Sequence, residues 1–304
     1  MTNASNLPRD IGSQDIRVIG PRRSGKTTFM AALARWPHAD PASPIQSVEP
    51  YTDEAGELIS LARDILEDGK DIAGTDYSGI SDDLPIYTLM ITFRAALLKN
   101  PIDHLRGKPL RIQVSCREYS GELMNDLRSS IPAAMGRYRN YLDDCASASG
   151  LLFLIDGTAA SDREYAQAIA VLERELNERM SLNTRTLQDF RVAIAFTKCE
   201  QPQVRVYWDR INEFCGLKFP ETYRALQRWQ QNWRCSMHYF YCSAYGMKGT
   251  PPKPNVRVGR RDQHGTYGVI DKPNVWRPLG LVAPLYWLQT GQIDPRMQID
   301  DPRI

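Results

Sequence analysis

Apolar positions along the chain follow two patterns, one typical of strands and one typical of helices. Short runs of apolar and β-branched residues predict strands, whereas apolar residues that recur every third or fourth position predict helices. The strand pattern occurs at residues 16–20, 85–98, 109–116, 150–156, 191–197 and 238–244. Only residues 99–108 join the second of these runs to the third, which is too short for a crossover helix, so we expect that pair to be antiparallel.

Helical patterns lie between most of these strands. The first predicted helix runs from Lys26 to about Trp36, and the second places Leu58, Leu61, Ile65 and Leu66 on one face. Further helices are expected at 121–145, at 161–180, in a tryptophan-rich stretch up to Cys235, and within 279–291. Such alternation predicts an α/β fold with a mainly parallel sheet, which the antiparallel pair interrupts.

The same pattern predicts one folded domain with two insertions. We expect a flexible N-terminus at 1–15, a single domain at 16–290 and a C-terminal tail at 291–304. Residues 37–84 form a long insertion before the second strand. Residues 246–278 form a basic insertion rich in proline and glycine. This composition suggests a mobile segment able to meet an acidic partner or nucleic acid, with a solvated surface loop as the simpler interpretation.

Composition narrows the classes of protein that remain. A formal net charge of +2 over 304 residues gives no case for a general nucleic-acid binder, because that affinity needs many clustered cations. The six cysteines and four histidines are scattered, which favours a reduced, cytoplasmic chain without a zinc site. No apolar run is long enough for a membrane span or a signal peptide.

The clearest chemical motif is a phosphate-binding loop. The stretch "GPRRSGKT" fits the pattern G-x-x-x-x-G-K-[ST], and it follows a strand and opens a helix, as that motif requires. The backbone N–H groups of such a loop surround phosphate oxygens at the positive end of the helix dipole. We expect this site to consist of Gly20, Ser24, Gly25, Lys26, Thr27 and Thr28, with the Lys26 ammonium on the β- and γ-phosphates and the Thr27 hydroxyl on Mg²⁺.

Three further motifs follow later strands in a fixed order. They are Glu118-Tyr119-Ser120-Gly121, then Thr197-Lys198-Cys199-Glu200, and then Ser243-Ala244. With the phosphate loop and the antiparallel pair, this order over residues 16–290 resembles the Ras-like class of P-loop GTPases, and most closely the bacterial double-GTPase-type proteins of signalling or defence systems.

The resemblance implies a P-loop NTPase fold of the α/β class, with a six-stranded, mostly parallel sheet, one antiparallel edge strand and helices on both faces. It also implies a role for each motif. In that family the first acidic residue holds the Mg²⁺ shell through water and the glycine N–H senses the γ-phosphate, which assigns these roles to Glu118 and Gly121. Thr197, Lys198 and Glu200 stand where the family reads guanine, and the Glu200 carboxylate would accept the hydrogen bonds of the base. The backbone of Ser243 and Ala244 would contact the guanine oxygen. The ligands are then GTP or GDP with Mg²⁺.

Hydrolysis and switching need further groups. Thr75, in the loop before the antiparallel strand, is a candidate switch hydroxyl for Mg²⁺, with Thr52 and Ser78 as alternatives. Glu122 stands where the family has its water-orienting glutamine, so we expect slow turnover. Arg22 or Arg23 in the phosphate loop would partly replace an arginine finger.

Two other functions remain open at this level. An ATPase or small-molecule kinase would use Lys26 together with Asp156 at the end of a buried strand. A nucleotide-binding interaction module would have lost hydrolysis. The favoured function is a regulatory GTPase that signals to a protein effector or activating partner, with no role for nucleic acid or membrane; the identity of the partner and the oligomeric state are not encoded in any motif.

Overall fold

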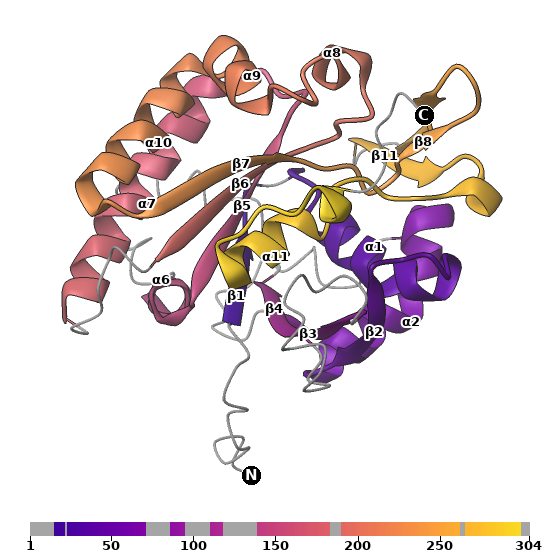
Figure 1. The fold of residues 1–304 in the computed structure, drawn as a ribbon, viewed down its shortest axis with the longest axis horizontal. Helices are drawn as coiled ribbons and strands as arrows, with labels where there is room; N and C mark the ends of the chain where they lie inside the picture. The colour runs from indigo at the N-terminus through magenta and orange to yellow at the C-terminus, as the bar shows by residue number, and fades with distance from the viewer. Residues whose placement is uncertain are drawn as a thin grey trace.

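One seven-stranded sheet forms the centre of the computed structural model (Figure 1). Residues 15–21, 23–70, 86–94, 110–117, 139–182, 190–261 and 265–298 are described. The strands are β1 (Asp15–Ile19), β2 (Ile45–Pro50), β3 (Ile86–Phe93), β4 (Arg111–Arg117), β5 (Gly150–Asp156), β6 (Arg191–Thr197) and β7 (Ser236–Tyr241), in the order β2-β3-β4-β1-β5-β6-β7. Four of the neighbouring pairs are parallel, and β3 is antiparallel to both β2 and β4. The predicted α/β class and the antiparallel pair are confirmed.

The predicted number of strands and the predicted edge are wrong. Strand β2 lies inside the stretch 37–84 that we took for an insertion, and it displaces β3 from the edge to the second position. Only Ile45 and Val48 of β2 are buried, and the strand ends at Pro50. An edge strand needs few apolar positions and tolerates proline, so its hydrophobic signal is weak.

Helices cover both faces of the sheet, as predicted. They are α1 (Lys26–Ala39), α2 (Asp53–Glu67), α6 (Arg139–Ser147), α7 (Asp162–Leu182), α8 (Pro202–Arg205), α9 (Ile211–Lys218), α10 (Pro220–Trp233) and α11 (Ala283–Thr290). Buried residues of α1, α2 and α11 share one apolar core with Leu152 and Leu154 of β5. Those of α6, α7, α9 and α10 share a second core with Leu151, Phe153 and Ile155 of the same strand. Within the described ranges, no helix is both long and apolar enough to cross a membrane.

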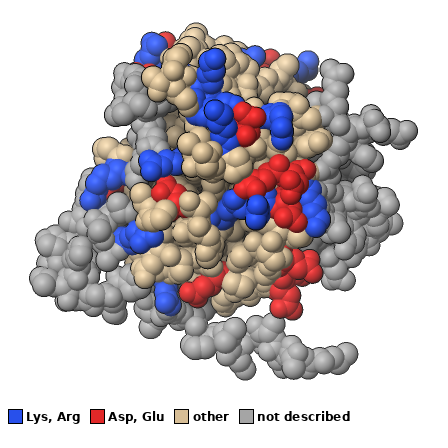
Figure 2. Space-filling view, turned by 90° about the vertical axis from the view of Figure 1, so that its right-hand side faces the viewer, with Lys and Arg blue, Asp and Glu red and all other residues tan. Residues whose placement is uncertain are grey.

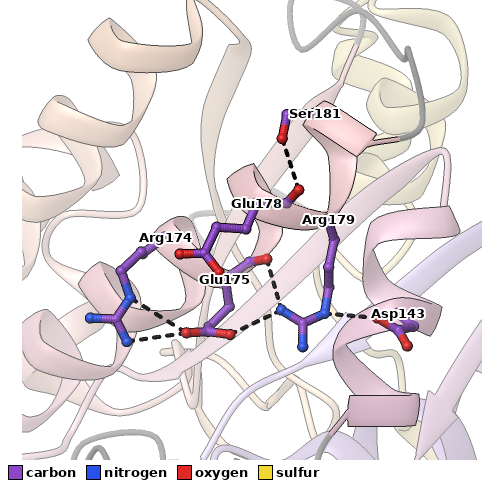
Figure 3. Close-up of polar contacts among 6 residues, drawn as sticks. All are labelled: Asp143, Arg174, Glu175, Glu178, Arg179 and Ser181. Atoms are coloured by element: carbon purple, nitrogen blue, oxygen red, sulfur yellow. Dashed lines mark hydrogen bonds and ion pairs between the residues drawn. The ribbon is translucent and has the colours of Figure 1, made fainter.

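A network of charged side chains on α7 includes an ion pair with α6 (Figure 3). Arg179 donates to Asp143 of α6 at 2.8 Å and to Glu175 at 2.9 Å, and Arg174 reaches the other oxygen of Glu175 at 3.1 Å. Glu175 is buried, and its two arginine partners offset the cost of burying its charge. This network explains the packing of two helices and lies outside the motifs.

The segment 246–278 has regular structure where we expected a mobile insertion. It forms two hairpins, β8 (Met247–Lys248) with β9 (Lys253–Pro254), and β10 (Val256–Arg261) with β11 (Gly265–Ile270). Part of its positive charge is paired. Lys248 bonds Asp271 within the segment, and Arg277 lies 3.3 Å from the carboxylate of Asp40 at the end of α1. In Figure 2, Lys and Arg gather at the height of these hairpins and Asp and Glu at the height of α2.

Residues on both sides of the predicted domain 16–290 also have regular structure where they are described. Of the expected flexible N-terminus, only Asp15 is described, and it begins β1. Beyond residue 290, a 3-10 turn (Pro295–Gln298) follows α11, and the Met297 side chain within it is fully buried in the core shared by α1 and α11. This part of the predicted tail therefore packs against the domain.

Candidate nucleotide-binding site

The turn from β1 into α1 has the backbone that a phosphate loop needs. Gly25 precedes the helix with φ +88°, and Gly20 has φ +154°. A Cβ at Gly20 would lie 2.6 Å from the Leu154 carbonyl oxygen and 2.7 Å from the Ser24 hydroxyl, so no larger residue fits there. Arg23, which is exposed, also takes a left-handed conformation, with φ +66°. A non-glycine residue in this region of backbone space is uncommon and occurs most often at functional turns.

The Lys26 side chain curls back over this loop. Its Nζ donates to the carbonyl oxygens of Gly20 at 3.0 Å and Pro21 at 3.2 Å, and the residue is only 7 % exposed. Gly25 has no side chain with which to cap α1, and the first turn contains no acidic residue. The helix therefore presents N–H donors and an ammonium group without a compensating anion, which is the environment that phosphate binds.

The loop after β6 is attached directly to the phosphate loop. The Thr197 hydroxyl donates to the Ser24 carbonyl oxygen at 2.9 Å, with the Ile155 carbonyl oxygen 3.3 Å away as a second acceptor. Thr197 is buried, and its side chain is in van der Waals contact with the position that a Cβ at Gly25 would take. Thr197, the first residue of the T-K-x-E motif, thus packs against the turn between β1 and α1 and bonds its backbone.

We expect Thr197→Val to destabilise the fold by about 1–3 kcal/mol. The substitution keeps the shape of the side chain but leaves the buried Ser24 carbonyl without its donor. Urea unfolding measures the loss. Thr290→Val, which removes a hydroxyl bonded to the Tyr286 carbonyl within the last turn of α11, is the matched control with a smaller expected loss. Equal unfolding midpoints for Thr197→Val and the unchanged chain would contradict the assignment.

Asp156, at the end of β5, has its carboxylate fully engaged. One oxygen accepts from the Thr158 N–H at 2.8 Å and from its hydroxyl at 2.6 Å, and the other pairs with the Lys198 ammonium. Lys198 itself stands in a left-handed conformation with φ +61°. The charge of Asp156 is therefore neutralised by neighbours, which disfavours it as the metal-binding carboxylate of a helicase-type ATPase.

Glu200 is the most unusual group in the site. It is 2 % exposed, and burial raises the pKa of its carboxyl above the ordinary value of 4.5. The Ser243 hydroxyl bonds to this carboxylate, and the Gln201 amide lies 3.4 Å from Oε1. Within the described residues, Oε2 has no hydrogen-bond partner although it is buried. A buried carboxylate oxygen without a donor is costly unless a ligand supplies one.

Eleven of the predicted residues thus lie together at the carboxyl ends of β1, β6 and β7 and in the first turn of α1. They are Gly20, Ser24, Gly25, Lys26, Thr27, Thr28, Thr197, Lys198, Glu200, Ser243 and Ala244. Arg23 belongs to the same loop as an exposed residue. Five predicted residues lie outside the described part of the chain: Arg22, Thr75, Glu118, Gly121 and Glu122. Their roles in switching, metal binding and hydrolysis stay predictions.

Sequence reasoning missed two aromatic residues beside the site. Tyr245 follows Ser243-Ala244, and its hydroxyl donates to the Gly268 carbonyl at 2.7 Å and bonds the Thr28 hydroxyl of α1. The Trp276 indole N–H donates to the Ala244 carbonyl at 2.8 Å. Burial raises the pKa of Tyr245 to about 12, so the phenol remains a neutral donor near pH 7. Only the position of Tyr245 after the S-A pair could have drawn attention to it.

Comparisons with known proteins give little beyond this geometry. No family model and no curated protein sequence matches the chain. One solved structure that matches is described as the signal recognition particle receptor SRb-GTP/SRX complex from Chaetomium thermophilum. The two chains are 12 % identical and superpose with a TM-score of 0.39, over 78 % of this chain and 93 % of that one. So loose a superposition does not establish a family, and the narrower resemblance to bacterial double-GTPase-type proteins gains no support from it.

Proposed function

We propose that the chain is a Mg²⁺-dependent, guanine-nucleotide-binding regulatory GTPase that signals to a protein partner. The phosphates lie in the loop from Gly20 to Thr27, with Lys26 on the β- and γ-phosphates. Thr27, half-buried in the first turn of α1, offers a hydroxyl oxygen of the hard kind that Mg²⁺ prefers. Thr75 and Glu118 complete the metal shell, and Arg22 or Arg23 offsets negative charge that develops during hydrolysis.

The observation that carries the proposal is the unpartnered Oε2 of Glu200 on a loop attached to the phosphate loop. Guanine presents two adjacent N–H donors, at N1 and at the 2-amino group, and a carboxylate accepts both. Adenine has an acceptor at N1 and no 2-amino group, so it leaves the buried oxygen unsatisfied. Because Glu200 is 2 % exposed, the base reaches it only when part of its cover moves.

Competition binding tests this proposal directly. A fluorescent GDP analogue is bound to the purified chain with Mg²⁺ and displaced by GTP or by ATP. We expect displacement by GTP at concentrations at least tenfold lower than by ATP, since leaving a buried polar group unpaired costs about 1–3 kcal/mol. Equal displacement, or preference for ATP, would support an ATPase or kinase. Phosphate release then separates a GTPase from a module that binds without hydrolysis.

The raised pKa of Glu200 predicts opposite pH dependences for stability and binding. In the ligand-free chain, folding raises the pKa of this carboxyl, so the folded state holds more protons and stability falls as pH rises from 4.5 towards the raised pKa. Guanine binds the ionised carboxylate, so affinity rises with pH over the same window. Denaturant unfolding and titration calorimetry across this window measure both slopes, and Glu200→Gln should abolish both contributions. Parallel slopes would exclude the role of Glu200.

A further inference from the structure

The segment from Tyr245 to Arg277 contacts helix α1 near the start of the helix, near its end and just past its end. The Tyr245 phenol bonds the Thr28 hydroxyl in the first turn. Further along, the Arg35 guanidinium lies 5.8 Å from the centre of the Trp276 ring, and Arg277 lies 3.3 Å from the Asp40 carboxylate just past the helix end. Because α1 starts at the phosphate loop and Tyr245 follows Ser243-Ala244, one segment contacts both the phosphate side and the base side of the site.

Tyr245 is the point at which these contacts meet the hairpin β10–β11. Its hydroxyl accepts from Thr28 and donates to the Gly268 carbonyl of β11 at 2.7 Å, which uses the one proton of the phenol. Gly268 leaves room for the ring: a Cβ there would lie 2.9 Å from the phenol oxygen and 3.0 Å from Cζ. A side chain at Gly268 would therefore press on the Tyr245 ring.

The hairpin is held as a unit on the rest of this segment. Tyr267 fills the space above Gly69 at the end of α2, where a Cβ would meet the ring at 2.2 Å, and the same ring lies over Gly259 across the hairpin. The buried Asn255 side chain bonds both the N–H and the carbonyl oxygen of Lys272, at 2.8 and 3.1 Å. These contacts hold the hairpin against α2 and join its two ends at its base.

We propose that hairpin β10–β11 controls the release of the bound nucleotide, with Tyr245 as the positioning residue that couples it to α1 and to the Ser243-Ala244 loop. This inference rests on the proposed function. When the hairpin is seated, Tyr245 holds the first turn of α1 and the loop that bonds Glu200 in one arrangement. When the hairpin moves, the phosphate side and the base side loosen together, and the nucleotide leaves.

Nucleotide dissociation kinetics test the coupling. The chain is loaded with a fluorescent GDP analogue, and the dissociation rate is measured after addition of excess unlabelled GDP. We expect Tyr245→Phe, which removes only the bridging hydroxyl, to speed dissociation about tenfold. Tyr239→Phe removes a hydroxyl from β7, for which no hydrogen bond is seen in the described structure, and should leave the rate unchanged.

A second pair of variants approaches the same contact from the hairpin. Gly268→Ala pushes on the Tyr245 ring from β11 and should also raise the dissociation rate. Gly56→Ala, in α2, is the matched control, because nothing lies within 4 Å of the added Cβ. Only folded, loaded molecules contribute to the measured rate. A smaller folded population alone would therefore reduce the loaded fraction, whereas the rate reports on the contacts of the loaded molecules.

The outcomes separate the two proposals. If the unchanged chain binds no guanine nucleotide, the proposed function is wrong, and this inference with it. If the chain binds GDP but Tyr245→Phe and Gly268→Ala dissociate at the rate of the unchanged chain and the controls, the release role is wrong and the proposed function stands. Faster dissociation in both variants, with neither control affected, supports the role of the hairpin.

Discussion

We expect Lys26→Ala to lower the affinity for GTP by about a hundredfold and to reduce hydrolysis to the background rate. The Lys26 ammonium lies against the loop, since it bonds the Gly20 and Pro21 carbonyl oxygens at 3.0 and 3.2 Å. A charge-assisted hydrogen bond to a phosphate contributes about 1.5–3 kcal/mol, and about 2.7 kcal/mol corresponds to a hundredfold change in affinity. Hydrolysis loses more than binding, because negative charge on the leaving β-phosphate grows in the transition state.

Equilibrium binding of a fluorescent GTP analogue and single-turnover phosphate release measure the two effects. Lys218→Ala is the matched control, because Lys218 is an exposed lysine in the last turn of α9, on the opposite face of the sheet from α1. Denaturant unfolding of each variant shows whether the fold is retained. Unchanged affinity in a folded Lys26→Ala variant would mean that the loop does not bind the phosphates, and the proposed function would be wrong.

The buried strands were the part of the fold best predicted from the sequence. Strand β5 is buried at every position, and β6 at every position but the first, so each appears as a continuous apolar run. Strand β2 lies at the edge and buries only Ile45 and Val48, so it leaves almost no such signal. The β10–β11 hairpin was missed for a related reason. It is held largely by single contacts, such as Tyr267 on Gly69, rather than by an apolar periodicity.

In the candidate site, features set by neighbouring residues could be predicted, whereas contacts between residues far apart in the sequence could not. The turn between β1 and α1 could be predicted because its glycine positions are dictated by local backbone geometry, as the φ of +88° at Gly25 shows. That this turn binds phosphate stays a prediction. The bond from Thr197 to Ser24 joins residues 173 positions apart, and no local pattern specifies it. The same holds for Tyr245, whose partners lie in α1 and β11. Motif order predicted which loops meet but not which side chains join them.

We expect Glu200→Gln to change the nucleotide that the site prefers from GTP to XTP. The substitution replaces one carboxylate oxygen with an amide NH₂ group, so the side chain accepts one hydrogen bond and donates another. One of the two guanine N–H groups then has no acceptor on this side chain. A hydrogen bond to a charged group contributes about 1.5–3 kcal/mol, so we expect GTP affinity to fall by about 10- to 150-fold. Xanthine carries a carbonyl where guanine carries its 2-amino group, so XTP affinity should rise.

The same substitution should leave the ligand-free fold at least as stable at pH 7. Burial raises the pKa of the Glu200 carboxyl, which means that its ionised form is disfavoured in the folded chain, and glutamine removes that cost. Competition binding with GTP and XTP and denaturant unfolding measure the two effects, with Glu57→Gln on the exposed face of α2 as the control. Reduced binding of GTP and XTP alike, together with lower stability, would show that Glu200 supports the loop rather than reads the base. Loss of GTP binding, gain of XTP binding and undiminished stability are results that only a base-contacting carboxylate produces together.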